Sequence, residues 1–386
     1  MPTILVLGYR GDLDQALRIR GVEPFYIVQA PVHVPEHRKF ICVSDMENAQ
    51  EVLRAVLSAD IGDVAGALTV HEMGVFTAAF LRRELGLPGN ADTKATLYFR
   101  DKYLQKSRLP PQVARARCRH VPRGTSYADL AKELGEVFVL KPANGAGSLR
   151  TNIIRTAQEY EQALEHFPWQ SDVEIVAEPF IDAPEVYIDG IWQDGDLRWW
   201  SMNRDRISPL SAVQGGVLAA HIMDSRRHPE LFRQGEALAR QALASLDAPD
   251  CVFHLEMFDE ESGLTFGECA MRLPGALAPR VNKLTFGVDL FDAEISLALG
   301  EKIAGIPDGR APDRFHGYLL LRRPRSGQLT QKDFEDNFVF DELQYSPDAP
   351  IGPYGRVGEA IVSDQDELKL QQTIEAIAHF NETGGE

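Results

Sequence analysis

Glu256 and Glu268 are the residues whose types and spacing point most directly to chemistry. Residues 254–258 alternate polar with apolar side chains, and residues 264–269 do so more loosely, which predicts two β-strands. Residues 261–263 lie between them and are typical of a three-residue hairpin loop with its glycine at the left-handed position. Counting outward from this loop places Glu256 directly opposite Glu268, on one face of the hairpin.

This hairpin predicts a site for a metal ion and an anion. The same count pairs Met257 with Gly267 and Asp259 with Thr265, and it puts His254, Ala270 and Arg272 on the face of the two glutamates. Like charges directly opposite each other destabilise a hairpin unless positive charge lies between them. Mg²⁺ prefers carboxylate oxygens and completes its shell with water and substrate phosphates, so both glutamates are candidate ligands.

Two neighbours of the glutamates are further candidates. Arg272 has the fork of donors that clamps a phosphate or a carboxylate. His254 is a candidate base or substrate-orienting residue, although a histidine on a strand is more often structural. For the pair as a whole, a surface hairpin with two solvated glutamates is the alternative interpretation.

The composition limits the class of protein. The chain has 386 residues, 44% hydrophobic and 25% charged, which is typical of a globular protein with two or three domains. A formal net charge of −17 argues against non-specific nucleic-acid binding, so we expect small-molecule partners and no nucleic acid. The four cysteines form no C-x-x-C pair, no apolar run approaches membrane-spanning length, and no basic leader begins the chain. We therefore expect a cytoplasmic protein without a membrane partner.

The first part of the chain alternates strands with helices, which predicts a parallel α/β sheet. The expected strands are residues 3–8, 25–29 and 64–70, and the expected helices are residues 12–20, 47–58 and 75–85. The turn at residues 8–11 lacks the third glycine of a dinucleotide-binding fingerprint. Glu72 follows the third strand, at the edge where open α/β sheets bind ligands, and is a candidate acceptor for a substrate ammonium group. Alternatively, Glu72 only begins the next helix.

A domain border is expected after the third helix. Leu-Pro-Gly at residues 87–89 breaks the pattern. Asp92 and Thr93 then predict the cap of a helix that runs through residues 100–106 and carries Lys102.

A glycine-rich loop follows the next strand. Residues 137–140 form a short apolar strand that ends at Lys141, and residues 142–148 come directly after it. Small residues let backbone N–H groups approach phosphate oxygens, and Ser148 adds a hydroxyl donor. The loop is not a Walker A motif, because the lysine precedes the glycines. A flexible hairpin turn is the alternative interpretation.

The segment after this loop has the apolar residues of a nucleotide pocket. Residues 174–177 predict a strand that runs into Glu178 and Pro179. Val176, Phe180 and Ile181 are candidates for the wall of an adenine pocket, and Glu185 is a candidate acceptor for ribose hydroxyls. An edge strand with charged ends is the alternative.

The remaining elements are expected to complete the catalytic part and a C-terminal lobe. They are a hairpin at residues 189–201, helices at 231–246 and 291–299, strands at 316–322, 338–345 and 356–363, and a helix at 365–380. For residues 202–221 we expect a solvated loop, in which Arg204, Arg206 and the turn at 214–216 are only candidates for substrate binding.

The order of these motifs resembles the ATP-grasp superfamily. The order is RDKYLQK with Lys102, VLKP with Lys141, NGAGS, EPFI followed by Glu185, and two strand-borne glutamates followed by Arg272. Within it, the chain is most similar to carboxylate–amine ligases related to bacterial L-amino-acid (dipeptide) ligases and carnosine synthase. In these, Glu72, GLPG, the RDK helix and an E-x-x-x-R stretch ending in glycine are familiar in this order. The resemblance covers residues 64–320.

The resemblance implies the fold class and a division into four domains. The fold would be α/β, with α+β character in the catalytic part: an ATP-grasp fold with an N-terminal parallel-sheet domain and a C-terminal β-rich lobe. The expected domains are residues 1–92 (N-terminal α/β), 93–182 (small lid subdomain), 183–310 (large catalytic subdomain) and 311–386 (C-terminal lobe).

The resemblance also implies roles for individual residues. Lys102 and Lys141 would contact the phosphates of ATP, and Asn144, Gly145, Ala146, Gly147 and Ser148 would close over them; Glu178, Pro179, Phe180 and Ile181 would hold adenine, and Glu185 would bind ribose. Glu256 and Glu268 would carry Mg²⁺, or Mn²⁺ in its place, with Glu268 bridging two ions, and Arg272 would stabilise an acyl phosphate and the tetrahedral intermediate. Ala270 stands where the pattern often has a metal-binding asparagine, which puts the second ion in doubt.

The function implied is ATP-dependent ligation of a carboxylate, expected to be an amino acid, to an amine, with release of ADP and phosphate. A carboxylate must first be activated as an acyl phosphate, and the glycine-rich loop would exclude water from it. The rival hypotheses are a bicarbonate-using carboxylase and an ATP-binding protein whose chemistry has decayed. A homodimer is expected from the resemblance alone.

Overall fold

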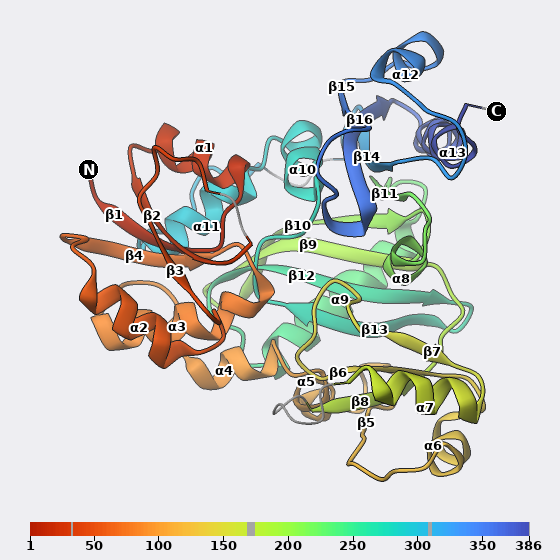
Figure 1. The fold of residues 1–386 in the computed structure, drawn as a ribbon, viewed down its shortest axis with the longest axis horizontal. Coiled ribbons are helices and arrows are strands. Elements are labelled where there is room, and N and C mark those ends of the chain that lie inside the picture. The colour runs from red at the N-terminus through yellow and green to blue at the C-terminus, as the bar shows by residue number, and fades with distance from the viewer. Residues whose placement is uncertain (32–33, 168–173, 308–310, 386) are drawn as a thin grey trace.

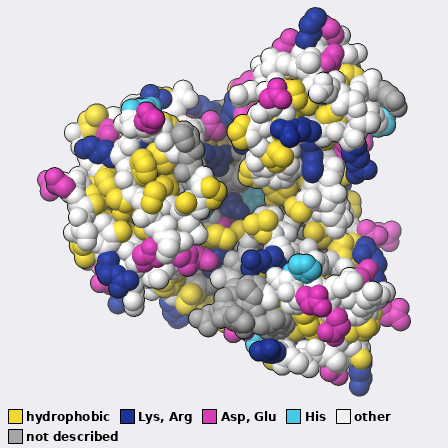
Figure 2. Space-filling view, in the orientation of Figure 1, with side chains coloured by type: hydrophobic (Ala, Val, Ile, Leu, Met, Phe, Trp, Pro, Cys, Tyr) yellow, Lys and Arg dark blue, Asp and Glu magenta, His cyan; other side chains and the backbone are white. Residues whose placement is uncertain are grey.

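The computed structural model describes residues 1–31, 34–167, 174–307 and 311–385. In these ranges the strands form three sheets (Figure 1). The space-filling view shows a hollow in the middle of the molecule (Figure 2). Lys and Arg side chains are visible inside that hollow. No helix in the described part of the chain is long and apolar enough to cross a membrane.

The N-terminal sheet is parallel, as predicted, with the strand order β3-β2-β1-β4. Its strands are β1 (Thr3–Leu7), β2 (Glu23–Gln29), β3 (Phe40–Val43) and β4 (Val64–Thr69), and its helices are α1 (Gly11–Ile19), α2 (Ala49–Ser58) and α3 (Val75–Leu85). The edge strand β3 was not predicted, because it has four residues of which one is buried. The short turn η1 (Glu72–Gly74) follows β4 and leads into α3.

The helix predicted through residues 100–106 is two helices, α4 (Thr93–Tyr98) and α5 (Lys102–Arg108). The break occurs at Asp101, whose carboxylate accepts hydrogen bonds from the backbone N–H groups of Tyr103 and Leu104 and so caps α5. Lys102 is therefore the first residue of α5, and its backbone N–H donates to the carbonyl oxygen of Ala143 at 2.9 Å. The break places Lys102 against the glycine-rich loop.

The second sheet is antiparallel and small, with the order β5-β8-β6-β7. Its strands are β5 (Arg119–His120), β6 (Phe138–Pro142), β7 (Asn152–Ile154) and β8 (Ile175–Pro179), with the helices α6 (Tyr127–Leu134) and α7 (Ala157–Glu165). The glycine-rich loop connects the hairpin strands β6 and β7, so it projects from one end of this sheet (Figure 1).

The third sheet has eight strands in the order β13-β12-β9-β10-β11-β14-β16-β15. They are β9 (Glu185–Gln193), β10 (Asp196–Asp205), β11 (Leu218–Ile222), β12 (Cys251–Glu260), β13 (Gly263–Ala270), β14 (Phe315–Arg322), β15 (Glu342–Tyr345) and β16 (Arg356–Asp364). The strands of the C-terminal lobe thus extend the sheet that carries the two glutamates.

The prediction of a loop over residues 202–221 was wrong in part. Strand β10 continues to Asp205, and β11 is a buried strand in the interior of the large sheet. Strand β11 contains two alanines and one histidine, which have little β-propensity, so its burial between β10 and β14 decides its conformation. Arg204 pairs with Asp259 and Arg206 with Glu375, so both guanidinium groups have protein partners.

Helices cover the large sheet and join it to its neighbours. They are α8 (Pro209–Val213), α9 (Pro229–Ser245), α10 (Ala278–Phe286), α11 (Leu290–Ala298), α12 (Gln331–Asn337) and α13 (Glu367–Thr383), together with the turn η2 (Pro353–Gly355). Helix α9 packs on β13, α13 packs on β14 and β16, and α11 contacts both β4 and α1. Helix α11 thereby ties the large sheet to the N-terminal sheet.

The hairpin of β12 and β13 has the predicted glutamate pairing but not the predicted turn. Glu256 lies opposite Glu268, as expected. Glu260 pairs with Gly263, so the loop has two residues instead of three. Met257 consequently pairs with Phe266, where the sequence predicted Gly267, and Asp259 pairs with Leu264, where it predicted Thr265.

A bulge at Gly267 explains why the glutamate pairing is nevertheless right. The register shifts by one residue between Glu256 and Met257, which offsets the residue missing from the loop. A β-carbon at Gly267 would lie 2.9 Å from the carbonyl oxygen of Glu256, so only glycine fits without movement of the backbone. The bulge therefore sets the register of the candidate metal ligands.

Candidate active site

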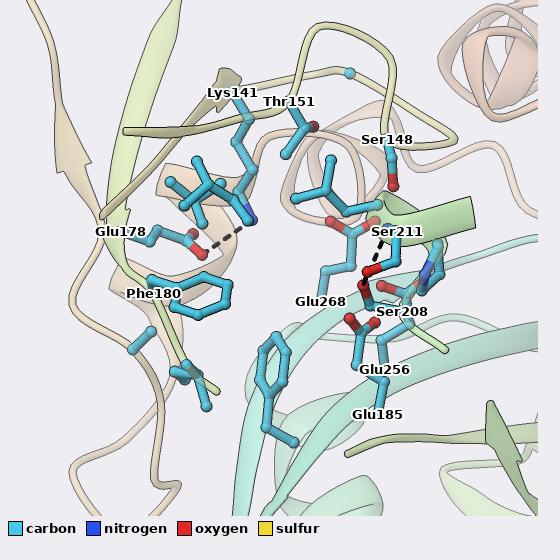
Figure 3. Close-up of a pocket in the computed structure, with 18 of the residues that line it drawn as sticks. Lys141, Ser148, Thr151, Glu178, Phe180, Glu185, Ser208, Ser211, Glu256 and Glu268 are labelled. Carbon is cyan, nitrogen blue, oxygen red and sulfur yellow. Dashed lines mark hydrogen bonds and ion pairs between the residues drawn. The ribbon is translucent and has the colours of Figure 1, made fainter. Parts of the chain in front are cut away.

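A cavity of about 550 Å³ lies between the small sheet and the large sheet (Figure 3). This size is typical of a small-molecule site. Of the predicted site residues, those that line it are Lys102, Lys141, Gly145, Ala146, Gly147, Ser148, Glu178, Pro179, Phe180, Ile181, Glu185, Glu256 and Glu268. Asn144, Glu72, His254 and Arg272 do not line it.

Glu178 sits between two lysines at the small-sheet side of the cavity. Its carboxylate lies 2.7 Å from Lys106 Nζ and 2.9 Å from Lys141 Nζ, and 5% of the residue is exposed. Burial alone would raise the pKa of Glu178, but the two lysines outweigh burial and lower it to about 2. The carboxylate therefore stays ionised and fixes Lys141 at the cavity wall. The sequence assigned Glu178 to adenine and did not single out Lys106.

The glycine-rich loop covers the cavity from above in the view of Figure 3. Gly147 and Ser148 have φ angles of +60° and +57°, which turn the loop back over the cavity. The Ser148 hydroxyl points into the space above Glu268 (Figure 3). Lys102 Nζ donates to the carbonyl oxygen of Gly145 at 2.8 Å, and Arg100 donates to that of Asn144 at 2.7 Å. The loop is therefore anchored at its start, and the cationic end of Lys102 lies directly beneath it.

Three carboxylates converge on the large-sheet side, from Glu185, Glu256 and Glu268 (Figure 3). Lys102 Nζ lies 3.1 Å from Glu268. Burial opposes ionisation of Glu268, but Lys102 and Lys141 outweigh it and lower the pKa to about 2. Burial and then the charge of Glu256 raise the pKa of Glu185 to about 8. Glu268 is therefore ionised at neutral pH, whereas Glu185 is mostly protonated.

The residues present fit a magnesium ion. Glu256 and Glu268 share one face of the hairpin, open into the cavity, and press on Glu185 by charge repulsion. In the described ranges, no group of three or more His, Cys, Asp or Glu side chains is arranged to hold a metal ion. The two hairpin carboxylates suit Mg²⁺, which takes its remaining ligands from water and substrate phosphates.

His254 lies beside this pair, with one carboxylate near each ring nitrogen. Its Nδ1 is 2.7 Å from Asp189 Oδ1 and its Nε2 is 3.3 Å from Glu256 Oε1. Asn282 Nδ2 donates to the second oxygen of Asp189 at 3.1 Å. Burial alone would lower the pKa of His254, but the two carboxylates outweigh burial and raise it to about 10. His254 is therefore an imidazolium that holds Glu256 in place.

Arg272 and Glu72 form an ion pair where the N-terminal domain meets the large sheet. The second partner of Glu72 is Arg100 Nη1, at 3.1 Å. Burial would raise the pKa of Glu72, but Arg272 and then Arg100 lower it. The Glu72 carboxylate is thus used in orienting Arg272, while its predicted contact with a substrate ammonium group stays a prediction.

Two segments that the sequence analysis did not single out also line the cavity. They are residues 207–211 of α8 and its approach, and Tyr354 of η2. Tyr354 has a φ of +58°, which is unusual for a residue that is not glycine, and its neighbour Gly355 has +74°. The Gly-Pro-Tyr-Gly stretch was a turn signal, but nothing in the sequence indicates that this turn reaches the cavity.

Comparison with known proteins agrees with this geometry. No protein-family model matches the chain. The L-arginine-specific L-amino acid ligase of Bacillus subtilis is 25% identical over 258 residues, which are 64% of this chain and 60% of that relative. The chain thus matches less than two thirds of the length of this relative.

Two solved structures resemble the whole chain. The L-amino acid ligase from Bacillus licheniformis superimposes with a TM-score of 0.79 at 17% identity, over 98% of this chain and 96% of that one. The carboxyaminoimidazole ribonucleotide synthase from Aspergillus clavatus, complexed with ATP, superimposes with a TM-score of 0.77 at 14% identity, over 97% of each chain. The predicted fold class and the resemblance to ATP-grasp carboxylate–amine ligases are both confirmed, and the chain has the ATP-grasp fold.

Proposed function

We propose that this protein is an ATP- and Mg²⁺-dependent ligase that joins a carboxylate to an amine through an acyl phosphate. The observation that carries the proposal is one cavity in which two lysines, a glycine-rich loop and two opposed glutamates meet. This set of groups neutralises and positions phosphates, which is most of what phosphoryl transfer requires.

The residues divide this work. Lys141, held by Glu178, and Lys102, held under the loop, supply positive charge for the phosphates of ATP. Glu256 and Glu268 would hold Mg²⁺, which supplies charge neutralisation on the phosphate oxygens. His254 and Asp189 orient Glu256 from behind. Phe180 and Ile181 line the cavity and would form the apolar wall of the adenine pocket.

Arg272 is the group we assign to the reacting carboxylate. Glu72 of the N-terminal domain pairs with Arg272 and is itself held by Arg100, and Arg272 Nη1 donates to the carbonyl oxygen of Leu273 at 2.8 Å. Arg272 does not line the cavity, so this assignment rests on the family resemblance, in which the arginine stabilises the negative charge of an acyl phosphate and of the tetrahedral intermediate. Amine attack then forms the C–N bond, and phosphate leaves with its electron pair.

An amino acid is the substrate class that we propose for the carboxylate, and a second amino acid or small amine for the acceptor. The name of the Bacillus subtilis relative supports this assignment, since that protein is an L-amino acid ligase. The cavity is large enough for a nucleotide together with a small substrate.

The test is release of ADP and phosphate with MgATP across amino acids, singly and in pairs, with hydroxylamine as a general amine in parallel. A hydroxamate formed with one carboxylate would identify the donor and show that an acyl phosphate exists. No ADP release with any carboxylate, together with tight ATP binding, would instead support the decayed-enzyme hypothesis.

Bicarbonate-dependent carboxylation is the second candidate. It is favoured by the superposition on carboxyaminoimidazole ribonucleotide synthase, whose fold matches as fully as that of the amino acid ligase. ADP release that depends on added bicarbonate and not on any amino acid would support it.

A further inference from the structure

The turn η2 brings one aromatic side chain from the C-terminal lobe into the cavity. Tyr354 lines the cavity together with Gly147, Ser148, Glu256 and Glu268. A β-carbon placed on Gly147 would lie 3.8 Å from the Tyr354 hydroxyl oxygen, which is ordinary contact distance. The Tyr354 hydroxyl therefore lies close to the glycine-rich loop.

The scaffold beneath Tyr354 is built to present it. Arg322 of β14 donates to the carbonyl oxygens of Ala212 and Gly216, at 2.7 and 3.3 Å, so it ties α8 to the sheet. A β-carbon on Gly355 would lie 2.7 Å from the same guanidinium group, so the turn rests directly on Arg322. The left-handed backbone of Tyr354 is kept against its intrinsic preference by these contacts.

The surroundings of the phenol favour a donor role. An unperturbed phenol has a pKa of about 10, so the Tyr354 hydroxyl keeps its proton at neutral pH. A protonated phenol next to the backbone of residues 147–148 is able to donate a hydrogen bond to the loop or to a phosphate oxygen beneath it.

We propose that Tyr354 is a positioning residue of the ligase reaction, which holds the glycine-rich loop closed over the carboxylates of β12 and β13. This inference rests on the proposed function. Tyr354 lines the cavity beside the loop, and its hydroxyl would donate a hydrogen bond to the backbone of the closed loop. Closure of this side keeps water from the activated carboxylate.

The acyl phosphate reacts with one of two nucleophiles, the amine or water. An acyl phosphate consumed by an amine gives an amide, phosphate and a proton. The same species consumed by water returns the free carboxylate and phosphate, so ATP is spent without product. Loss of Tyr354 shifts the reaction toward water.

The first experiment measures hydroxamate formed per ADP released by the full-length protein, with MgATP, hydroxylamine and the carboxylate found in the amino-acid screen. Tyr354→Ala is expected to keep ADP release while the hydroxamate yield per ADP falls severalfold. Tyr354→Phe keeps the ring and is expected to lie between Tyr354→Ala and the wild type. Ile351→Ala is the matched control, because Ile351 lies on the same loop, is 64% exposed and does not line the cavity. A wild-type yield per ADP in Tyr354→Ala would overturn the inference.

The second experiment requires no catalysis. Limited trypsin digestion of the unliganded protein cleaves after Arg150, an exposed residue of the loop. Tyr354→Ala is expected to accelerate this cleavage relative to both wild type and Ile351→Ala, with unchanged cleavage elsewhere. Equal rates in all three would overturn the role of Tyr354. If the wild type releases no ADP with any carboxylate, the proposed function fails, whereas the digestion still decides the contact of Tyr354 with the loop.

Discussion

Replacing Glu178 with glutamine removes one charge and leaves two buried lysines. Glu178 lies 2.7 Å from Lys106 and 2.9 Å from Lys141, and these contacts form the least exposed ion cluster at the site. Glutamine keeps the shape of the side chain, so the loss is electrostatic. Removing one partner of a buried charge cluster costs far more stability than replacing the whole cluster with apolar residues. The reason is that the charges left behind stay desolvated.

The size of the expected loss of stability follows from the lowered pKa of the Glu178 carboxyl group. The lysines lower the pKa of Glu178 from 4.5 to about 2, against the effect of burial. At about 1.4 kcal/mol per pKa unit, Glu178→Gln is expected to lower the free energy of unfolding at pH 7 by roughly 3 kcal/mol. A carboxyl group with a lowered pKa contributes this stability above its unfolded pKa near 4.5 and loses it as the pH falls toward 2.

Urea unfolding of wild type and variant at pH 7 and at several lower pH values measures this difference. Glu174→Gln is the matched control, since Glu174 directly precedes β8 and its side chain is 65% exposed in its pair with His120. We expect the control to change stability by less than about 0.5 kcal/mol. A loss below about 1 kcal/mol for Glu178→Gln, or a loss that does not shrink below pH 4.5, would refute the reasoning.

Three further predictions concern the hairpin and Arg272. Gly267→Ala is expected to destabilise the protein by about 1–3 kcal/mol in urea unfolding, because its β-carbon meets the Glu256 carbonyl oxygen. Gly275→Ala has nothing within 4 Å of the new carbon and is the control. Glu268→Gln is expected to raise the Mg²⁺ concentration needed for half-maximal ADP release by at least tenfold, and an unchanged Mg²⁺ titration would contradict the metal assignment. Arg272→Ala is expected to lower hydroxamate formation by about 10²–10³-fold while ATP still binds in an equilibrium titration; near-normal turnover would remove Arg272 from the reaction.

Much of the candidate site followed from local patterns. The alternation of residues 254–258 and the position of the glycines were enough to pair Glu256 with Glu268, although the turn and the bulge were both missed. The two errors cancelled, because the bulge adds to β13 the residue that the loop lacks. A bulge depends on how a strand packs against its neighbours, so alternation alone does not reveal it.

Local sequence patterns did not predict the contacts between distant segments. The family resemblance assigned Glu178 to the adenine pocket, and local patterns did not predict that its carboxylate lies between Lys106 and Lys141. His254 was a candidate base until Asp189 and Glu256 were found on its two nitrogens. Glu178 of β8 meets Lys106 of α5 and Lys141 of β6, and His254 of β12 meets Asp189 of β9, so these contacts join separate elements.

The sequence by itself determined the order of the motifs and the parallel N-terminal sheet, because these depend on short-range periodicity and on turn residues. Only the tertiary structure decided which charges neutralise one another and which segments close the cavity. Strand β11 and the turn that carries Tyr354 have weak local signals, and they take their positions because the eight-stranded sheet continues into the C-terminal lobe. Burial and long-range contacts set these features, and a single stretch of sequence carries little information about either.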